Sequence, residues 1–410
     1  MLTGASRVAS GGKAFSRLGR ISLAMLVVLA AVVSIKVVEQ PTVAADRQSA
    51  LEPLEQLGAK LFVDTDLSLN RTQSCATCHD PDAAFADPRT SKAGRAVSTG
   101  DDGRSLGDRN TPTLMYAHFT PPLTKRNDGT FVGGLFWDGR ANTLEEQAKG
   151  PFLNPVEMGM PDAASVAERI AEKDDYVVRL KALFGADVLS DPEQTFDAVA
   201  KALAAYQRTS EFSPFDSRYD RWLRGEAKLS SQEEFGRIVF VTWNCHLCHK
   251  PMHMGDPNRE LFTSFEYHNI GLPKNTRVRA LNGKGAHYMD AGLRDGARTS
   301  GETQFGKFKV PTLRNIAVTA PYMHNGVFED LKTAIQFYNK YTSRRVTWQI
   351  NPETGLTWGD PETSSNMSHT QLQTGLSLDD NRIAALEAFL KTLTDKRYEH
   401  LLDAPRGESK

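Results

Sequence analysis

Apolar residues recur at helical spacing along much of the chain, and this pattern predicts a mainly α-helical protein. Ahead of the first cysteine, leucines follow one another at intervals of three and four residues, at Leu51, Leu54, Leu57 and Leu61. This spacing places them on one face of an amphipathic helix. A longer helix is predicted over residues 196–206, and two more are predicted near 331–341 and 379–394.

Polar positions predict where several helices begin and where the chain forms loops. A serine or threonine followed three residues later by glutamate is the capping-box pattern of a helix start. It occurs for Thr143 with Glu146, Ser165 with Glu168, and Ser231 with Glu234. Residues 80–127 and 342–377 are rich in Gly, Pro, Asn, Asp, Ser and Thr, which predicts long loops.

Residues 1–45 follow a different pattern, that of an export signal. Four basic residues precede an apolar run over 21–38, and the small-residue stretch Val43-Ala44-Ala45 follows it. A retained membrane anchor is the alternative, because the apolar run is nearly long enough to span a bilayer. Lys36 and the plausible cleavage site favour removal. We therefore expect a signal peptide over 1–45, a periplasmic protein, and no membrane attachment after its removal.

The composition is that of a globular protein. The chain has 410 residues, 40% of them apolar and 24% charged, which is ordinary for two or three packed domains. The formal net charge is −1, with 49 Lys and Arg against 50 Asp and Glu. Removing residues 1–45 takes away five basic residues and one acidic residue, which leaves 44 against 49, or about −5. This acidic balance argues against nucleic-acid binding.

All four cysteines of the chain belong to two C-x-x-C-H motifs. In this signature two thiols bond the edge of a haem, and the adjacent histidine ligates the iron. Two copies that use every cysteine, behind an export signal, predict two covalently bound haem c groups in the periplasm. The residues are Cys75, Cys78 and His79 for the first haem, and Cys245, Cys248 and His249 for the second.

The order of elements repeats along the chain. In each half a capped or amphipathic helix leads directly into a haem motif, and the stretch 210–216 is the candidate boundary. We expect two cytochrome c-like domains with one haem each, over residues 46–210 and 211–410.

The first haem lacks an obvious sixth ligand. No histidine occurs between His79 and His118, and no methionine occurs between His79 and Met115. Haems that activate peroxide or oxygen leave the sixth position open, whereas electron-transfer haems fill it with Met or His. The first haem is therefore predicted to be the open, reactive one, although a distant residue reaching the iron would close it.

An open haem that cleaves peroxide needs a group that moves a proton between the two oxygens. Glu157 is the candidate general acid–base, with Gln147 and Pro151 as walls of the pocket. The alternative for Glu157 is a solvated carboxylate on a loop. Trp137 is either a core residue or an oxidisable aromatic that bridges the two haems.

Four further motifs give the chain a family resemblance. They are Phe-Trp-Asp-Gly-Arg at 136–140, Asn-Pro-Val-Glu-Met at 154–158, Lys-Val-Pro-Thr-Leu-Arg-Asn at 309–315 and Pro-Tyr-Met-His-Asn-Gly at 321–326. With the two haem motifs, they resemble the bacterial dihaem cytochrome c peroxidase superfamily over roughly residues 52–400. The similarity is greatest to its methylamine-utilisation branch, which matures the tryptophan tryptophylquinone of methylamine dehydrogenase.

The resemblance makes Tyr338 the discriminating residue. Peroxidases of the superfamily have methionine at this position as the sixth ligand of the second haem, whereas the methylamine-utilisation branch has tyrosine. Leu331, Ala334 and Ile335 share a helical face with Tyr338, which therefore points inward. The alternatives are a buried tyrosine with a hydrogen-bond partner, Tyr341 as a weaker ligand, and Met323 as the best methionine.

The resemblance also implies how the protein acts. Peroxide, or oxygen with electrons from an unidentified periplasmic donor, would generate a bis-ferryl state shared by both haems. Trp137 would carry charge between the haems, and Trp243 would relay electrons from the protein substrate, precursor methylamine dehydrogenase. The alternative for Trp243 is packing at the haem edge.

Two further sets of residues complete the expectations. The family places one Ca²⁺ between the haems, and its ligands map to Asn110 and to the carbonyls of Thr319 and Pro321; oxygen ligands suit this ion. From the sequence alone these are turn residues. His246, His253 and His268 receive no role.

Two rival functions remain. A dihaem cytochrome c peroxidase is the first, and Tyr338 counts against it. A non-catalytic dihaem electron carrier is the second, and the missing histidine after His79 counts against it.

Overall fold

The computed structural model describes residues 51–251, 256, 259–296 and 301–403. The predicted signal peptide and His253 lie outside these residues. Within them, no helix has both the length and the apolar character needed to cross a membrane.

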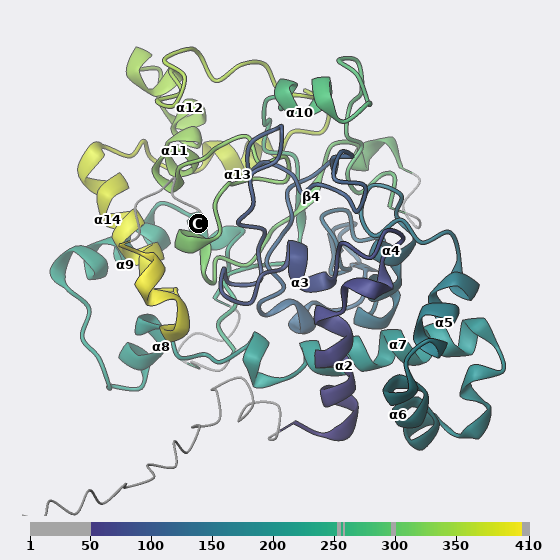
Figure 1. The fold of residues 1–410 in the computed structure, drawn as a ribbon. Coiled ribbons are helices and arrows are strands. Elements are labelled where there is room, and N and C mark those ends of the chain that lie inside the picture. Colours follow the sequence, from purple (N-terminus) through teal and green to yellow (C-terminus); the bar gives the residue numbers. More distant parts are fainter. Residues whose placement is uncertain (1–50, 252–255, 257–258, 297–300, 404–410) are drawn as a thin grey trace, which may run out of the picture.

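The described chain is mainly helical, as predicted, with long irregular segments between the helices. Figure 1 shows α2 and α4–α7 gathered on one side of the molecule and α8, α9, α11, α12 and α14 on the other, with loops between them. The helices of the first side, together with the short α3 of the first haem motif, are α2 (Pro53–Val63), α3 (Cys75–Cys78), α4 (Leu144–Leu153), α5 (Ala163–Ala171), α6 (Asp174–Phe184) and α7 (Pro192–Gln207).

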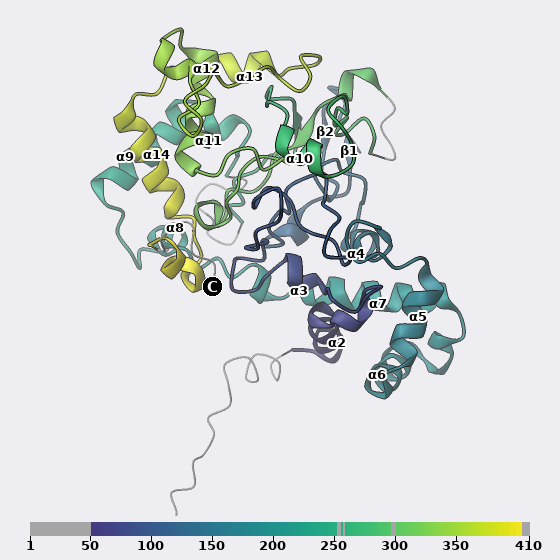
Figure 2. The same ribbon diagram turned by 45° about the horizontal axis from the view of Figure 1, so that its top comes forward.

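The second half of the chain supplies the remaining helices, and Figure 2 shows the same separation from a second direction. They are α8 (Arg218–Leu223), α9 (Ser231–Thr242), α10 (Thr276–Leu281), α11 (Leu331–Phe337), α12 (Asn339–Thr342), α13 (His369–Gln373) and α14 (Asp380–Lys391). Two small antiparallel sheets pair β1 (Thr124–Lys125) with β2 (Phe131–Val132), and β3 (Tyr267–His268) with β4 (Phe308–Lys309).

The same helix crossing occurs ahead of each haem motif. In α2, a Cβ added to Gly58 would meet the backbone of Ala202 in α7 and would lie 2.8 Å from Tyr206 Cβ. In α9, a Cβ added to Gly236 would meet the backbone of Ala385 in α14 and would lie 2.8 Å from Phe389 Cβ. Only glycine lets the two backbones approach so closely. These crossings fix each motif against a later helix of its own half.

Two of the three predicted helix caps are wrong in their residues. Thr143 is the N-cap of α4, as predicted, and its hydroxyl oxygen accepts from the Glu146 N–H. Glu146 Oε2 accepts from the Asn142 N–H, not from the Thr143 N–H, so the capping box is not completed. Helix α5 is capped by Asp162, so Ser165 lies inside the helix. Helix α9 is capped by Ser230 with Glu233, one residue before the predicted pair.

The core consists of separate hydrophobic clusters. The largest joins residues from 57 to 215 and also includes Leu261, Phe265 and Tyr398 from the second half. Another lies entirely within residues 219–393. Phe212 and Phe215, in the candidate boundary stretch, are buried in the first cluster. The two halves therefore share packing, and the division at residue 210 stays a prediction.

Candidate active site

The first C-x-x-C-H motif forms one wall of a cavity of about 590 Å³, which we call cavity 1. The motif cysteines form the single turn α3, and His79 caps its C-terminal end. Cys75, Cys78 and His79 all line cavity 1, and neither cysteine is in a disulfide. The volume lies within the range of cofactor pockets.

A second cavity, of about 270 Å³, is built in the same way and is called cavity 2. Cys245, Cys248 and His249 line it, and both cysteines are free thiols. Each cavity therefore combines two thiols with the imidazole of its motif, which is the donor set that holds a haem by its edge and by its iron.

Both motif histidines are held by a backbone carbonyl. His79 Nδ1 lies 3.0 Å from the Phe85 carbonyl oxygen, and His249 Nδ1 lies 3.2 Å from that of Phe262. Such a bond fixes the ring and leaves Nε2 for a metal. Burial lowers the pKa of His79 and lowers that of His249 to about 4, and this direction favours the neutral ring that ligates iron. The residues present fit one haem in each cavity.

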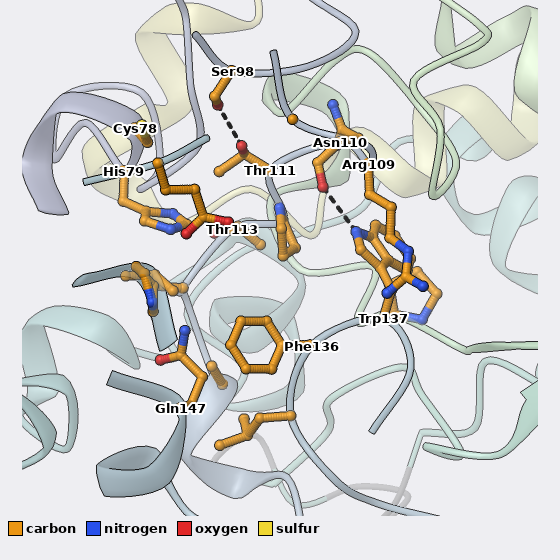
Figure 3. A pocket seen from close by; sticks show the side chains of 18 of the residues that line it. Cys78, His79, Ser98, Arg109, Asn110, Thr111, Thr113, Phe136, Trp137 and Gln147 are labelled. Atoms are coloured by element: carbon orange, nitrogen blue, oxygen red, sulfur yellow. Dashed lines mark hydrogen bonds between the residues drawn. The ribbon is translucent and has the colours of Figure 1, made fainter. Parts of the chain in front are cut away.

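The predicted acid–base group lies in cavity 1. Glu157, Gln147 and Pro151 all line it, and Figure 3 shows Gln147 in the same pocket as His79. After α4 ends, the Glu157 N–H donates to the Asn154 carbonyl at 2.9 Å, in a turn that brings the carboxylate to the cavity. Asn154 Nδ2 donates to Glu157 Oε1 at 2.8 Å, while burial raises the pKa of this carboxyl. Glu157 is therefore a half-buried carboxyl in the cavity wall with a raised pKa, and not the solvated carboxylate of the alternative.

The wall of cavity 1 shows which side chains could serve as a second iron ligand besides His79. Among the described residues that line cavity 1, His79 is the one histidine, and His118 is not part of the wall. Three methionines, Met115, Met158 and Met323, do line it. The described lining agrees with the prediction that no second histidine ligates the first iron. Three thioethers line the same cavity, so an open sixth position on this iron stays a prediction.

Helix α11 presents Tyr338 to cavity 2. Leu331, Ala334, Ile335 and Tyr338 all line this cavity, as their shared helical face predicts. Tyr338 is 37% exposed and lines cavity 2. Tyr341 instead donates from its hydroxyl to the Ile270 carbonyl at 2.7 Å, which excludes it from the wall.

The methionine alternative also lies at cavity 2. Met323 lines both cavities, so the structure places a thioether as well as the Tyr338 phenol near the second motif.

Trp137 stands between the cavities and lines both of them. Its Nε1 donates to the Asn110 carbonyl at 2.8 Å, and Figure 3 shows this bond on the far side of the pocket from His79. The Lys309 N–H donates to the Trp137 carbonyl at 2.9 Å. The ring is therefore fixed in a shared wall, where an aromatic carrier of charge would have to be.

Trp243 lies at the C-terminal end of α9 and lines cavity 2. The Arg382 guanidinium carbon lies 4.9 Å from the centroid of its ring. Its Nε1 is buried and makes no hydrogen bond within the described part of the chain. Packing at the edge of the cavity is thus observed, and a role in electron relay is compatible with it.

The three predicted calcium ligands all line cavity 1: Asn110, Thr319 and Pro321. Asn110 Nδ2 donates to the Ala96 carbonyl at 3.2 Å, which leaves Oδ1 as the amide atom for a cation. The peptide bond between Ala320 and Pro321 is cis. Within the described ranges, no cluster of three or more His, Cys, Asp or Glu side chains suits a metal, so a site here would depend on carbonyl oxygens.

Several wall residues were not predicted as site residues. His324 stacks on Phe308 with ring centroids 3.5 Å apart, lines cavity 2, and has a buried Nε2 without a hydrogen-bond partner among the described residues. Lys309 lines both cavities, and Arg109 lines cavity 1. Cations and a donor nitrogen suit the carboxylate side chains of a haem. Lys309 and His324 lie inside two of the four motifs that carry the family resemblance, at 309–315 and 321–326, and this was the available signal.

Comparison with known proteins agrees with this geometry. A family model described as "Di-haem cytochrome c peroxidase" matches residues 52–228. The chain is 59% identical to the "Methylamine utilization protein MauG" of Paracoccus denitrificans, over 90% of this chain and 95% of that protein. It is 31% identical to the "Cytochrome c551 peroxidase" of Pseudomonas aeruginosa, over 70% and 72% of the two chains.

A solved structure shares the fold. The diheme peroxidase BthA of Burkholderia thailandensis superposes with a TM-score of 0.74 and 34% sequence identity, over 85% of this chain and 90% of that one. The motifs, the paired cavities and these relatives agree. The chain therefore belongs to the dihaem cytochrome c peroxidase family of oxidoreductases.

Proposed function

We propose that this protein completes tryptophan tryptophylquinone in precursor methylamine dehydrogenase, using peroxide, or oxygen with electrons, as the oxidant. Family membership implies two haems, and the relative with 59% identity is named for methylamine utilisation. The observation that carries the proposal is Tyr338 in the wall of cavity 2, because an anionic oxygen ligand favours oxidised iron.

In cavity 1 the protein would hold the first haem. Cys75 and Cys78 would bond its edge, and His79 Nε2 would ligate the iron while the Phe85 carbonyl fixes the ring. When bound, a haem with an open ligand position would supply the site at which peroxide reacts. Glu157 would take a proton from the near peroxide oxygen and return it to the leaving one, and the Asn154 amide would orient the carboxylate.

In cavity 2 the second haem would be held by Cys245, Cys248 and His249, with Tyr338 as a further ligand from the cavity wall. Trp137 would pass electrons between the cavities, because its ring lines both and is held in place by the Asn110 carbonyl. Neither cavity needs room for a side chain of the partner protein, since the partner would be oxidised at a distance.

Trp243 would be the point of electron entry from the partner. Its ring lies at the edge of cavity 2, and the neighbouring Val241 and Leu247 of the same segment are 39% and 38% exposed. Exposed apolar side chains beside an oxidisable ring suit contact with another protein.

Four further assignments belong to the same proposal. One Ca²⁺ would bind Asn110 Oδ1 and the carbonyls of Thr319 and Pro321, and would hold the cavity 1 wall near Trp137. The protein would act in the periplasm after loss of residues 1–45. An unidentified periplasmic donor would supply electrons when oxygen replaces peroxide. The two haem-bearing units would be residues 46–210 and 211–410.

A second candidate function is peroxide reduction with electrons from a cytochrome c. Met323 in the wall of cavity 2 favours it, because a thioether ligand raises the reduction potential of a haem.

The deciding experiment mixes the haem-loaded protein and hydrogen peroxide with precursor methylamine dehydrogenase. We expect quinone absorbance to grow in the partner, and none to grow when either protein or peroxide is omitted. Absence of that growth, together with rapid peroxide-driven oxidation of a reduced cytochrome c, would replace the proposal by the second candidate.

A further inference from the structure

Tyr116 is a buried tyrosine in the wall of cavity 1 that the proposed reaction does not use. It is 2% exposed and lines the same cavity as His79. Its hydroxyl donates to Asp395 Oδ1 at 2.6 Å and accepts from the Phe215 N–H at 3.2 Å. The phenol therefore joins cavity 1 to a carboxylate from the far end of the chain.

Asp395 is fully buried and held in place for this bond. Asn315 Nδ2 donates to its second oxygen at 2.7 Å, and the Asp395 N–H donates to Asn315 Oδ1 at 2.8 Å. The carboxylate thus has a fixed orientation and one short contact with a hydroxyl proton. Carboxylates are proton acceptors, whereas peptide carbonyls are not.

This distinguishes Tyr116 from Trp137. The Trp137 N–H donates to the Asn110 carbonyl, which cannot take up its proton, so an electron lost from that ring leaves a charged ring that is readily reduced again. The Tyr116 proton already faces a base. Loss of an electron from Tyr116 can therefore be accompanied by loss of its proton.

The surroundings of Tyr116 favour the neutral product. The Arg314 guanidinium carbon lies 5.2 Å from the centroid of the Tyr116 ring, and Arg314 is fixed by Asp220 at 2.5 and 2.8 Å. A positive charge on the ring would be repelled by this cation. A neutral phenoxyl radical would not be, and the Phe215 N–H would still donate to its oxygen.

We propose that Tyr116 is an outlet for oxidising equivalents that form at cavity 1 and find no partner protein. One electron leaves Tyr116 and reduces one of the two oxidising equivalents that peroxide leaves in the protein, and the phenol proton moves to Asp395 Oδ1. The other oxidising equivalent stays at the cavities. A tyrosyl radical and a protonated Asp395 result. This inference rests on the proposed peroxide chemistry of cavity 1, but not on the identity of the partner.

The test treats the haem-loaded protein with hydrogen peroxide in the absence of any partner and records the electron paramagnetic resonance spectrum. We expect a tyrosyl signal that narrows when the protein contains ring-deuterated tyrosine. The signal is lost in Tyr116→Phe. It is kept in Tyr206→Phe, the matched control, because Tyr206 is a buried tyrosine bonded to Glu211 at 3.0 Å that does not line cavity 1.

A second arm addresses the proton. Asp395→Asn keeps the shape of the residue but removes the base, so the signal should fall while Tyr116 is intact. Burial raises the pKa of Asp395 to about 6, with Arg314, Tyr116 and Asn315 opposing the rise and Asp216 adding to it. The radical yield of the native protein should therefore fall as the pH drops below about 6, where Asp395 is protonated.

Peptide mapping after repeated peroxide treatment gives an independent readout, with oxidised products expected at Tyr116. An unchanged tyrosyl signal in Tyr116→Phe would overturn the inference. If Asp395→Asn fails to fold, the Tyr116→Phe result decides by itself. A Tyr116 radical in a protein that makes no quinone would contradict the proposed function while leaving this inference intact.

Discussion

At the scale of single residues, a hydrogen bond to a backbone carbonyl holds several of the functional side chains in place. The cysteines, His79 and His249 were predicted from their motifs, because the motif itself specifies the chemistry. The carbonyls of Phe85 and Phe262 that hold the two imidazoles were not predicted. Any residue has a carbonyl, so only the path of the backbone reveals that these two are used. The Asn110 carbonyl, which accepts from Trp137 Nε1, was not predicted for the same reason.

Glu157 gives the sharpest test at this scale. Glu157→Gln keeps the hydrogen bond from Asn154 but removes the proton carrier, so peroxide-driven turnover should fall by about 10²–10⁴-fold. Single-turnover kinetics with peroxide measures this directly. Glu168→Gln, at an exposed position of α5, is the matched control and should react at the native rate. A native rate in Glu157→Gln would remove the acid–base assignment.

At the scale of elements, the sequence predicted where helices occur better than where they begin. The stretch Ser230–Glu234 contains two overlapping capping boxes, and the structure uses the first. At α5, Asp162 Oδ1 accepts from both the N–H and the hydroxyl of Ser165, at 2.8 Å each, so the aspartate outcompetes the serine as the cap. Nothing in the helical spacing distinguishes such neighbouring candidates.

The glycine crossings were also invisible to periodicity, although each determines how a haem motif is anchored. Gly236→Ala would press a methyl group into the Ala385 backbone and should lower the free energy of unfolding by about 1–3 kcal/mol. Denaturant unfolding of the haem-loaded protein measures it. Gln232→Ala, on the exposed side of α9, should change the value by less than about 0.5 kcal/mol. Equal stability of the two variants would mean that α9 and α14 do not cross this closely.

At the scale of the whole molecule, the two halves are interlocked. The core cluster of the first half takes in Leu261, Phe265 and Tyr398, and Tyr116 bonds Asp395 across the halves. Trp137, from the first half, also lines the cavity of the second haem motif. The sequence predicted two similar units, but contacts between them depend on long-range packing that no local pattern encodes.

The proposed catalyst is split between two cavities, with peroxide chemistry at the first and stored oxidising power at the second. Trp137 provides the shared wall through which the two cavities would communicate. The split depends on what ligates the second iron, and the structure offers Tyr338 and Met323 there. The choice between them separates the proposed function from peroxide reduction.

The most direct measurement is the resonance Raman and optical spectrum of the oxidised Tyr338→Phe variant, compared with Tyr341→Phe. Tyr341 is the matched control because its hydroxyl is bonded to the Ile270 carbonyl and lies off the cavity wall. We predict that Tyr338→Phe loses the vibrations of an iron-bound phenolate and changes the spectrum of the second haem alone, while Tyr341→Phe keeps both. A native spectrum of the second haem in Tyr338→Phe would contradict the account.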